Sequence, residues 1–169
     1  TENQLKKATR VNGLFGRVGE LRTLLTSPDG TTWTTRSSGT TDPLFGVTYG
    51  NGTFVTVGGG SGTILTSPDG TTWISRTSGT GNYLYGVTYG NGTFVTPCTS
   101  GIIFTSTNGT TWTPRTSGTS DNLIGITYGN GTFVVVGSSG TILTSSDGTT
   151  WTSRTSGTTN RLIIVLHRN

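Results

Sequence analysis

The hydrophobic positions of this chain fall in short runs that alternate with turns rich in Gly, Ser, Thr, Asn and Asp. The runs are rich in aromatic and β-branched residues, and examples of the four kinds are residues 84–89, 132–136, 141–144 and 151–155. Short runs of this composition, bounded by turn residues, are typical of β-strands. No stretch of ten residues has the spacing of an amphipathic helix, so the pattern predicts an all-β protein.

The same pattern is written four times, with a period of 39 or 40 residues. One anchor is an Asn-Gly pair, which predicts a tight hairpin turn because both residues of such a turn need positive φ. The pairs begin at Asn12, Asn51, Asn91 and Asn130. The longer period contains one additional glycine within residues 58–62. Four short strands in about forty residues predict one blade of a β-propeller, and hence four four-stranded antiparallel blades in this chain.

The second anchor is a tryptophan that closes a turn before the fourth strand of each repeat. In this turn an Asp can hydrogen-bond its own backbone, and a Gly tolerates a left-handed conformation. The residues that we expect to hold the four turns are Ser27, Asp29, Gly30, Trp33, Ser67, Asp69, Gly70, Trp73, Ser106, Asn108, Gly109, Trp112, Ser145, Asp147, Gly148 and Trp151. Two roles stay open for the tryptophans: packing that closes the turn, or exposed platforms that stack on sugars.

These turns resemble the Asp-box, also called the bacterial neuraminidase repeat, whose family form is Ser-x-Asp-x-Gly-x-Thr-Trp. The copies in this chain, such as residues 27–33 and 67–73, are one residue shorter between Asp and Trp. The resemblance implies a β-propeller in which the box joins the third and fourth strands of a blade. It implies no single activity, because Asp-box propellers include sialidases, other glycoside hydrolases, sorting-receptor ectodomains and photosystem assembly factors.

Both ends of the chain align with the first, innermost strand of a blade. Residues 162–168 are apolar and β-branched, whereas residues 5–11 are polar and suit a buried strand poorly. The alignment predicts an arm or diverged strand over residues 1–11 and four blade repeats over residues 12–161, with periods beginning near 12, 51, 91 and 130. A surplus innermost strand follows at residues 162–169.

Three uses of the surplus C-terminal strand stay open. It could pair with residues 14–18 of its own chain and close a small four-bladed ring. It could instead complete a blade of the next molecule, so that identical chains associate through their terminal strands. In the third case the chain is a piece of a longer propeller.

Charge does not point to a nucleic-acid partner, although the formal net charge is +4. Only 11% of residues are charged, and one arginine recurs on the fourth strand of each repeat. These arginines are Arg36, Arg76, Arg115 and Arg154. Because they are spread around the domain, we expect either solvated, turn-pairing residues or a ring that holds an acidic partner or a carboxylated sugar. No secretory leader or membrane-length apolar run is present, so we expect no membrane insertion.

Acid and base groups are scarce in this chain. Its acidic residues are Glu2, Glu20, Asp29, Asp42, Asp69, Asp121 and Asp147. A glycosidase needs two carboxylates that flank one bond, and repeats this alike do not offer such an asymmetric site. The one histidine, His167, lacks other ligands at metal-binding spacing, and the one cysteine, Cys98, stands where sibling repeats have glycine. We therefore expect no enzyme, no metal and no cofactor.

The sequence favours a non-catalytic structural or interaction module, such as a self-assembling scaffold. The runner-up is a lectin that binds carbohydrate at equivalent sites between blades, with Trp or Tyr stacking and Arg or Asp hydrogen bonds. A sialidase-like glycoside hydrolase is the least favoured. Four Asn-Gly-Thr tripeptides match the N-glycosylation sequon, although turn geometry alone explains Asn-Gly. They begin at Asn51, Asn91, Asn108 and Asn130. Glycans at these positions would accompany an extracellular or cell-surface location, which is the location that we expect.

Overall fold

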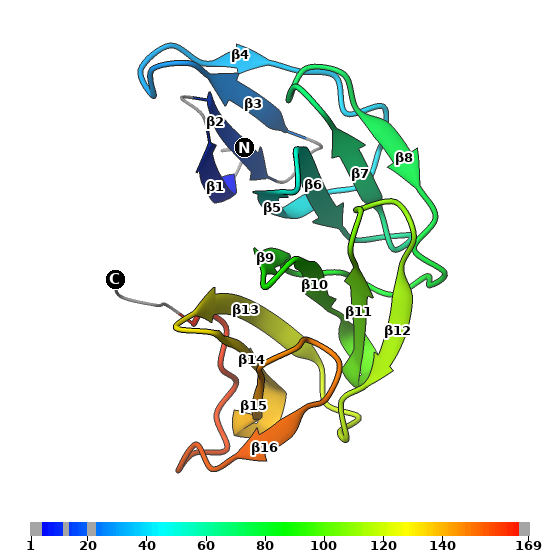
Figure 1. Cartoon of the computed structure of the whole chain (residues 1–169), viewed down its shortest axis with the longest axis vertical. Coiled ribbons are helices and arrows are strands. Elements are labelled where there is room, and N and C mark those ends of the chain that lie inside the picture. Colours follow the sequence, from blue (N-terminus) through cyan, green and yellow to red (C-terminus); the bar gives the residue numbers. More distant parts are fainter. Residues whose placement is uncertain (1–4, 12–13, 20–22, 166–169) are drawn as a thin grey trace.

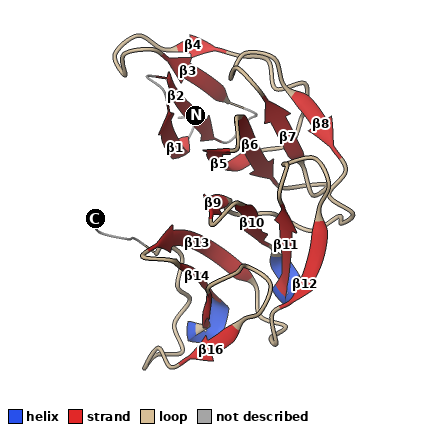
Figure 2. Ribbon diagram, in the orientation of Figure 1, coloured by secondary structure: helices blue, strands red, loops and turns tan. Residues whose placement is uncertain are grey.

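Four antiparallel sheets of four strands each make up the computed structural model, which describes residues 5–11, 14–19 and 23–165 (Figure 1). The prediction of an all-β fold with four four-stranded blades is confirmed. In every sheet each strand is hydrogen-bonded to its neighbours in sequence. The helical segments in Figure 2 are the 3-10 turns η1 (Thr99–Gly101) and η2 (Ser138–Gly140). Among the described residues, no helix is long and apolar enough to cross a lipid bilayer.

The four sheets follow one another along the chain. The first consists of β1 (Leu5–Val11), β2 (Leu14–Gly19), β3 (Leu24–Ser27) and β4 (Thr34–Thr35). The second consists of β5 (Leu44–Gly50), β6 (Thr53–Gly58), β7 (Ile64–Ser67) and β8 (Ile74–Arg76). The third consists of β9 (Thr88–Gly90), β10 (Thr93–Pro97), β11 (Ile102–Ser106) and β12 (Thr113–Thr116). The fourth consists of β13 (Leu123–Gly129), β14 (Thr132–Gly137), β15 (Ile142–Ser145) and β16 (Thr152–Arg154).

The sheets stand side by side along an open arc (Figure 1). The first strands, β1, β5, β9 and β13, are innermost, and the fourth strands, β4, β8, β12 and β16, form the outer rim. Contacts between consecutive sheets run from β1 and β2 to β5, from β5 to β9, and from β9 and β10 to β13. The sheets therefore have the radial arrangement of propeller blades, and we number the blades 1 to 4 in chain order.

The N-terminal segment completes blade 1. Residues 5–11 form the strand β1 and not a free arm, with Val11 opposite Leu14 and Leu5 opposite Gly19. The four-bladed ring closed by the C-terminal strand is therefore not the arrangement of the single chain, in which residues 14–18 pair with β1. Residues 161–165 carry no strand, and residues 166–169 lie outside the described part of the chain.

The hairpin turns adopt the backbone conformation that Asn-Gly predicts. Asn51, Asn91 and Asn130 have φ of 45°, 45° and 47°. The glycines that follow them, at positions 52, 92 and 131, also have positive φ. Both central residues are therefore left-handed, as a two-residue hairpin turn requires. The pair at residues 12 and 13 lies outside the described residues.

The first strand of blade 3 is shorter than its sequence predicts. The run over residues 84–89 yields only β9 (Thr88–Gly90), with Leu84 joined to Cys98 by an isolated bridge. In blades 2 and 4 the corresponding strands are continuous, but their register shifts between Leu44 and Gly46 and between Leu123 and Gly125. A glycine stands at this point in each run, and glycine inside a strand favours such irregularities.

Three hydrophobic clusters fill the boundaries between consecutive blades. The cluster between blades 1 and 2 contains Val18, Leu24, Leu44, Val47 and Leu65. The cluster between blades 2 and 3 contains Val55, Val57, Ile64, Leu84, Val87, Phe94, Cys98, Phe104 and Trp112. The cluster between blades 3 and 4 contains Val95, Ile103, Leu123, Ile126, Phe133, Val135 and Leu143. Because each cluster draws side chains from two blades, no blade buries its apolar face alone.

Candidate functional site

The turn between the third and fourth strands of each blade is held by its own side chains. In blade 2, the Ser67 hydroxyl donates to Asp69 Oδ1 at 3.0 Å and accepts the Gly70 N–H at 2.8 Å. Asp69 Oδ1 also accepts the backbone N–H groups of residues 71 and 72, at 2.8 and 3.0 Å. Trp73 Nε1 donates to the Gly70 carbonyl at 3.1 Å. One carboxylate oxygen and one hydroxyl therefore organise the whole turn.

The other three turns repeat this geometry. The indole N–H of Trp33, Trp112 and Trp151 donates to the carbonyl three residues earlier at 3.1, 3.0 and 3.1 Å. In blade 3, Asn108 stands in place of the aspartate, and its Oδ1 accepts the N–H groups of residues 110 and 111 at 2.8 and 3.0 Å. The turn therefore needs an oxygen acceptor and does not need a negative charge.

Each turn aspartate has a pKa well below its ordinary value of 3.8. For Asp29 the main cause is the hydrogen bond from the Thr32 N–H, and for Asp69 it is the hydrogen bond from the Thr71 side chain. Asp147 resembles Asp29, since its pKa is lowered mainly by a backbone N–H. Hydrogen bonds that favour the ionised form lower a pKa in this way. These carboxylates therefore stay ionised at neutral pH and do not donate protons as general acids.

The tryptophans lie at blade boundaries. Trp112 is 9% exposed, and its ring centroid lies 6.5 Å from that of Phe94. Trp73 and Trp151 are partly buried and lie at 6.4 and 6.5 Å from the phenylalanine of their own blades. Their indoles also pack against the clusters shared with the preceding blade. This geometry favours the packing role over open platforms for sugar stacking.

The recurring arginines lie on or beside the outer strand of four separate blades, so the structure does not bring them together. Each donates its Nε to a threonine of the neighbouring third strand, at 2.8 to 2.9 Å. The pairs are Arg36 with Thr26, Arg76 with Thr66, Arg115 with Thr105 and Arg154 with Thr144. These bonds tie the rim strand to the rest of the blade.

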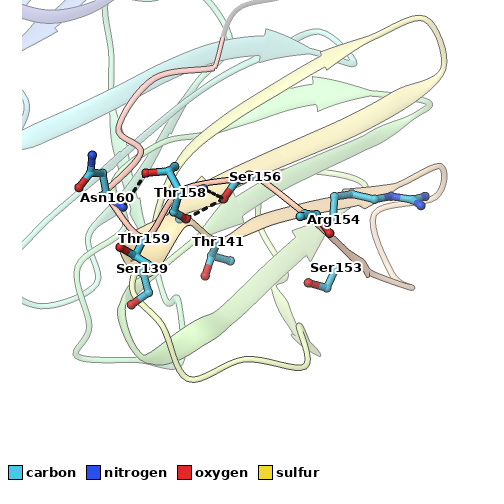
Figure 3. Close-up of a pocket in the computed structure, with 11 residues that line it drawn as sticks. Ser139, Thr141, Ser153, Arg154, Ser156, Thr158, Thr159 and Asn160 are labelled. Carbon is cyan, nitrogen blue, oxygen red and sulfur yellow. Dashed lines mark hydrogen bonds between the residues drawn. The ribbon is translucent and has the colours of Figure 1, made fainter.

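Two equivalent open grooves lie at the outer rim. One in blade 2 is lined by Arg76, by residues 61–63 and by the loop over residues 77–80. The other, in blade 4, is lined by Arg154, by residues 139–141 and by the loop over residues 155–160 (Figure 3). Hydroxyl groups dominate both linings. In Figure 3 the Arg154 side chain extends away from the labelled side chains of the loop, so the blade-4 groove offers mainly hydroxyl and backbone groups. Asp42 also lines the groove in blade 2.

The loop aspartates also have structural partners. Asp42 accepts the Thr63 hydroxyl, and Asp121 accepts the hydroxyls of Thr141 and Ser139 at 2.6 and 3.2 Å. Each carboxylate therefore links the loop entering a blade to the start of that blade's third strand. Among the described residues, no group of three His, Cys, Asp or Glu side chains could hold a metal ion. Glu2, Glu20 and His167 lie outside the described residues.

Two of the candidate glycosylation residues make hydrogen bonds between blades, which the sequence did not indicate. The Asn51 side-chain amide donates to the Thr107 carbonyl at 3.3 Å, and the Asn91 amide donates to the Ser146 carbonyl at 3.3 Å. Each bond joins the hairpin of one blade to the tryptophan turn of the next. The Asn108 side chain is engaged inside its own turn.

A cluster of aromatic side chains lies where the repeats differ. Phe45, Tyr83 and Tyr85 stack with ring centroids 5.5 to 6.3 Å apart, and Tyr83 is 44% exposed. A Cβ on Gly59 would lie 2.3 Å from the Tyr83 ring. The glycine-rich loop of the longer repeat therefore makes room for this cluster.

Cys98 is an unreactive core residue. It is fully buried and belongs to the cluster between blades 2 and 3. Burial is the main cause that raises its pKa to about 11. Because the thiolate is the reactive form, this thiol is a poor nucleophile and a poor metal ligand at neutral pH.

Comparison with known proteins shows the fold. No family model and no curated protein sequence matches the chain. Among solved structures, YCF48 from Cyanidioschyzon merolae matches with a TM-score of 0.75 and 19% identity, over 97% of this chain and 60% of that one. YCF48 bound to D1 peptide matches with a TM-score of 0.64 and 17% identity, over 90% of this chain and 53% of that one.

Two further neighbours widen the range of functions. The computationally designed Ika8 protein matches with a TM-score of 0.77 and 12% identity, over 98% of this chain and 53% of that one. An ancestral GH74 enzyme matches with a TM-score of 0.69 and 14% identity, over 88% of this chain and 24% of that one. The chain has the fold of β-propeller proteins and spans between half and two thirds of the length of YCF48 and Ika8. Because the neighbours include both enzymes and non-enzymes, the fold defines no activity.

Proposed function

We propose that this chain is a non-catalytic structural and interaction module that self-assembles into a scaffold. The observation on which this proposal rests is the open arc of Figure 1, in which blades 1 and 4 each lie beside a single other blade. Propeller blades bury their apolar faces against neighbours on both sides. Blades at the two ends of an arc therefore favour association with further blades. The structural neighbour YCF48 bound to D1 peptide supports a protein partner for this fold.

The absence of catalysis is proposed from how the carboxylates are used. Asp29, Asp69 and Asp147 hold turns, while Asp42 and Asp121 hold loops. Each is engaged in hydrogen bonds that hold its own turn or loop, and this structural use argues against a pair of carboxylates that flank one substrate bond. The ionised turn carboxylates also cannot supply the proton that glycoside cleavage requires.

The scaffold proposal is tested by light scattering over a concentration series of the full chain. We expect particles heavier than one chain, with a fraction that rises with concentration. A single-chain mass at every concentration would overturn the scaffold. A parallel assay with fluorogenic sialosides and glucosides should show no turnover above buffer, and enzyme-dependent turnover would overturn the non-catalytic assignment.

A lectin is the second candidate, and two observations favour it. The rim grooves present repeated hydroxyl groups, and Tyr83 offers an exposed aromatic ring beside Phe45 and Tyr85. Aromatic faces and polar groups together suit the apolar and hydroxyl surfaces of a sugar ring. A glycan array tests this candidate, with Tyr83→Ala as the site variant and Ile74→Ala, which alters an exposed residue of β8, as the control. Binding lost only in Tyr83→Ala supports the lectin, and no binding by the parent chain rejects it.

We also propose that the four turns are Asp-boxes, that the protein works outside the cell or at its surface, and that it carries glycans there. The shared Ser, Asp or Asn, Gly and Trp hydrogen bonds support the first proposal. The Asn-Gly-Thr tripeptides, which begin at exposed residues, support the third. Peptide mass mapping of protein from its native source tests glycosylation, and unmodified peptides at all four sequons would reject it.

A further inference from the structure

The boundaries inside the chain share one packing arrangement. Val55 of β6 and Val95 of β10 are fully buried, and each lies under the tryptophan turn of the following blade. A Cβ on Gly109 would lie 3.0 Å from Val55 Cγ2, and a Cβ on Gly148 would lie 3.0 Å from Val95 Cγ2. The turn glycine of one blade is therefore fitted against the second-strand valine of the blade before it.

Blade 4 presents the same surface without this cover. Val134 of β14 corresponds to Val55 and Val95, yet it is partly exposed. Ile142 and Thr144 are also partly exposed, whereas their counterparts in blades 2 and 3 are buried. We call Val134, Ile142 and Thr144 the blade-4 face. The structure shows which surface fits this face, because the tryptophan turn of the following blade covers the equivalent face in blades 2 and 3.

The hairpin of blade 4 is also uncovered, unlike the hairpins of blades 2 and 3. Gly50 and Gly90 are buried under the rings of Tyr89 and Tyr128, whose atoms would lie 2.1 and 2.2 Å from an added Cβ. Gly129 holds the corresponding position in blade 4 and is partly exposed. Three separate features of the blade boundary thus remain uncovered at this end: the valine, the third-strand residues and the hairpin glycine.

The complementary surface lies at the other end of the same chain. Blade 1 carries the turn of Ser27, Asp29, Gly30 and Trp33, with the same hydrogen bonds as the turns that cover blades 2 and 3. A second copy of the chain therefore brings a turn of matching geometry to the blade-4 face. The Pro28 carbonyl corresponds to the Thr107 and Ser146 carbonyls, which accept the hairpin amides of the preceding blades.

The C-terminal segment already follows the path into a further blade. Leu162 N donates to the Gly137 carbonyl at 2.9 Å, as Leu84 N does to Gly58 and Leu123 N does to Cys98. Leu123 begins β13, the inner strand of blade 4, and Leu84 forms the isolated bridge that precedes β9 in blade 3. Residues 162–165 therefore lie where the innermost strand of the next blade begins. Ile163 and Ile164 are 56% and 74% exposed, which is unusual for large apolar side chains.

We propose that the blade-4 face and residues 162–165 receive blade 1 of a second copy, so that two chains close into one ring of eight blades. Residues 162–165 then pair with the partner's β2 and take the place of its β1. The exchange replaces the polar sequence of residues 5–11 with Leu-Ile-Ile-Val at the innermost position. This inference rests on the proposed scaffold role and names its partner and interface.

The length of known propellers favours closure with two copies. This chain superposes almost completely on 53% of Ika8, so its blades are arranged as in a propeller nearly twice its length, and on 60% of YCF48, which is shorter than Ika8. Two copies related by a two-fold axis make the same contact twice, from blade 4 of each to blade 1 of the other.

The mass of the particle and two matched variants test the inference. The full chain should have the mass of two copies by native mass spectrometry, and Val134→Glu should reduce it to one copy, because a charge would be buried in the interface. Ile74→Glu places the same charge on β8, away from this face, and should leave the mass at two copies. Circular dichroism of Val134→Glu should match that of the parent, since Val134 is partly exposed in the single chain.

The outcomes separate the interface from the scaffold role. A particle of several copies that Val134→Glu does not disrupt would overturn this interface and leave the scaffold proposal standing. A particle that grows without limit would overturn the two-copy ring. A single-chain mass for the parent at all concentrations would overturn both the interface and the scaffold.

Discussion

Gly109 of the third tryptophan turn lies directly against Val55 of the preceding blade. A Cβ added to Gly109 would come within 3.0 Å of Val55 Cγ2, and Gly109 has a φ of +75°. Gly148 and Val95 repeat the relationship one blade later. The turn glycine thus serves two purposes: it permits a left-handed backbone, and it allows two blades to approach closely.

Replacement of Gly109 by alanine separates these two purposes. The left-handed backbone alone costs a non-glycine residue about 1–2 kcal/mol, and overpacking against Val55 adds about 1–3 kcal/mol. Gly118→Ala is the matched control, since Gly118 has a φ of +84° with nothing within 4 Å of an added Cβ. Urea denaturation should show a clearly larger loss for Gly109→Ala. Equal losses would mean that the contact with Val55 does not matter.

Gly16→Val should stabilise the protein. Gly16 of β2 occupies the position of Val55 and Val95, and a small cavity between blades 1 and 2 is lined by Gly16, Thr26 and Gly70. A valine suits a strand and fills this space, so we expect a gain of about 0.5–2 kcal/mol in the free energy of unfolding. Gly46→Val is the control, because an added Cβ there would lie 3.0 Å from the Gly86 backbone. A loss of stability in Gly16→Val would contradict the proposed packing.

We expect the folded protein to lose stability in acid, because the turn aspartates have lowered pKa values. Their pKa values are lowered on folding, so their contribution is fully present above the unfolded value of 3.8 and is lost as the pH falls through the folded values. Stability measured by urea denaturation should therefore fall as the pH is lowered from 5 to 2. Asp69→Asn should reduce this fall while preserving stability at pH 7, because Asn108 performs the same role in blade 3. An unchanged pH profile in Asp69→Asn would argue against the hydrogen-bonded carboxylate.

Cys98 should react with thiol reagents only after unfolding. Its side chain is fully buried and burial raises its pKa to about 11, so little thiolate exists at pH 8 and reagents cannot reach it. Reaction with Ellman's reagent should be slow in buffer and complete in concentrated urea. Rapid reaction of the folded chain would contradict the packing between blades 2 and 3.

The repeat pattern predicted the blades and their turns because both depend on local sequence. Asn51 adopts the left-handed conformation of its hairpin turn, and Asp69 holds its own turn through bonds from nearby backbone N–H groups. The relationship between blades was not predictable in this way. The bond from Asn51 to Thr107 joins residues 56 positions apart, and the local sequence around either residue does not predict this pairing.

The exposure of Val134 illustrates the same limit. Val134, Val55 and Val95 occupy equivalent positions in similar sequences, yet only Val134 is partly exposed. The difference arises because a following blade covers Val55 and Val95, whereas no following blade in this chain covers Val134. Sequence predicted a surplus strand at the C-terminus, but it left open whether residues 5–11 are an arm or a strand, and the pairing of β1 with β2 decides this for the single chain.

A disulfide between copies is the most direct test of the two-chain ring. Because Asn130 and Pro28 correspond to the bonded pair of Asn51 and Thr107, the double variant Asn130→Cys with Pro28→Cys should oxidise to a covalent two-chain species on a non-reducing gel. The control, Asn51→Cys with Thr107→Cys, should form its disulfide within one chain. Cross-linking in the control together with only single chains in the test variant would contradict the account.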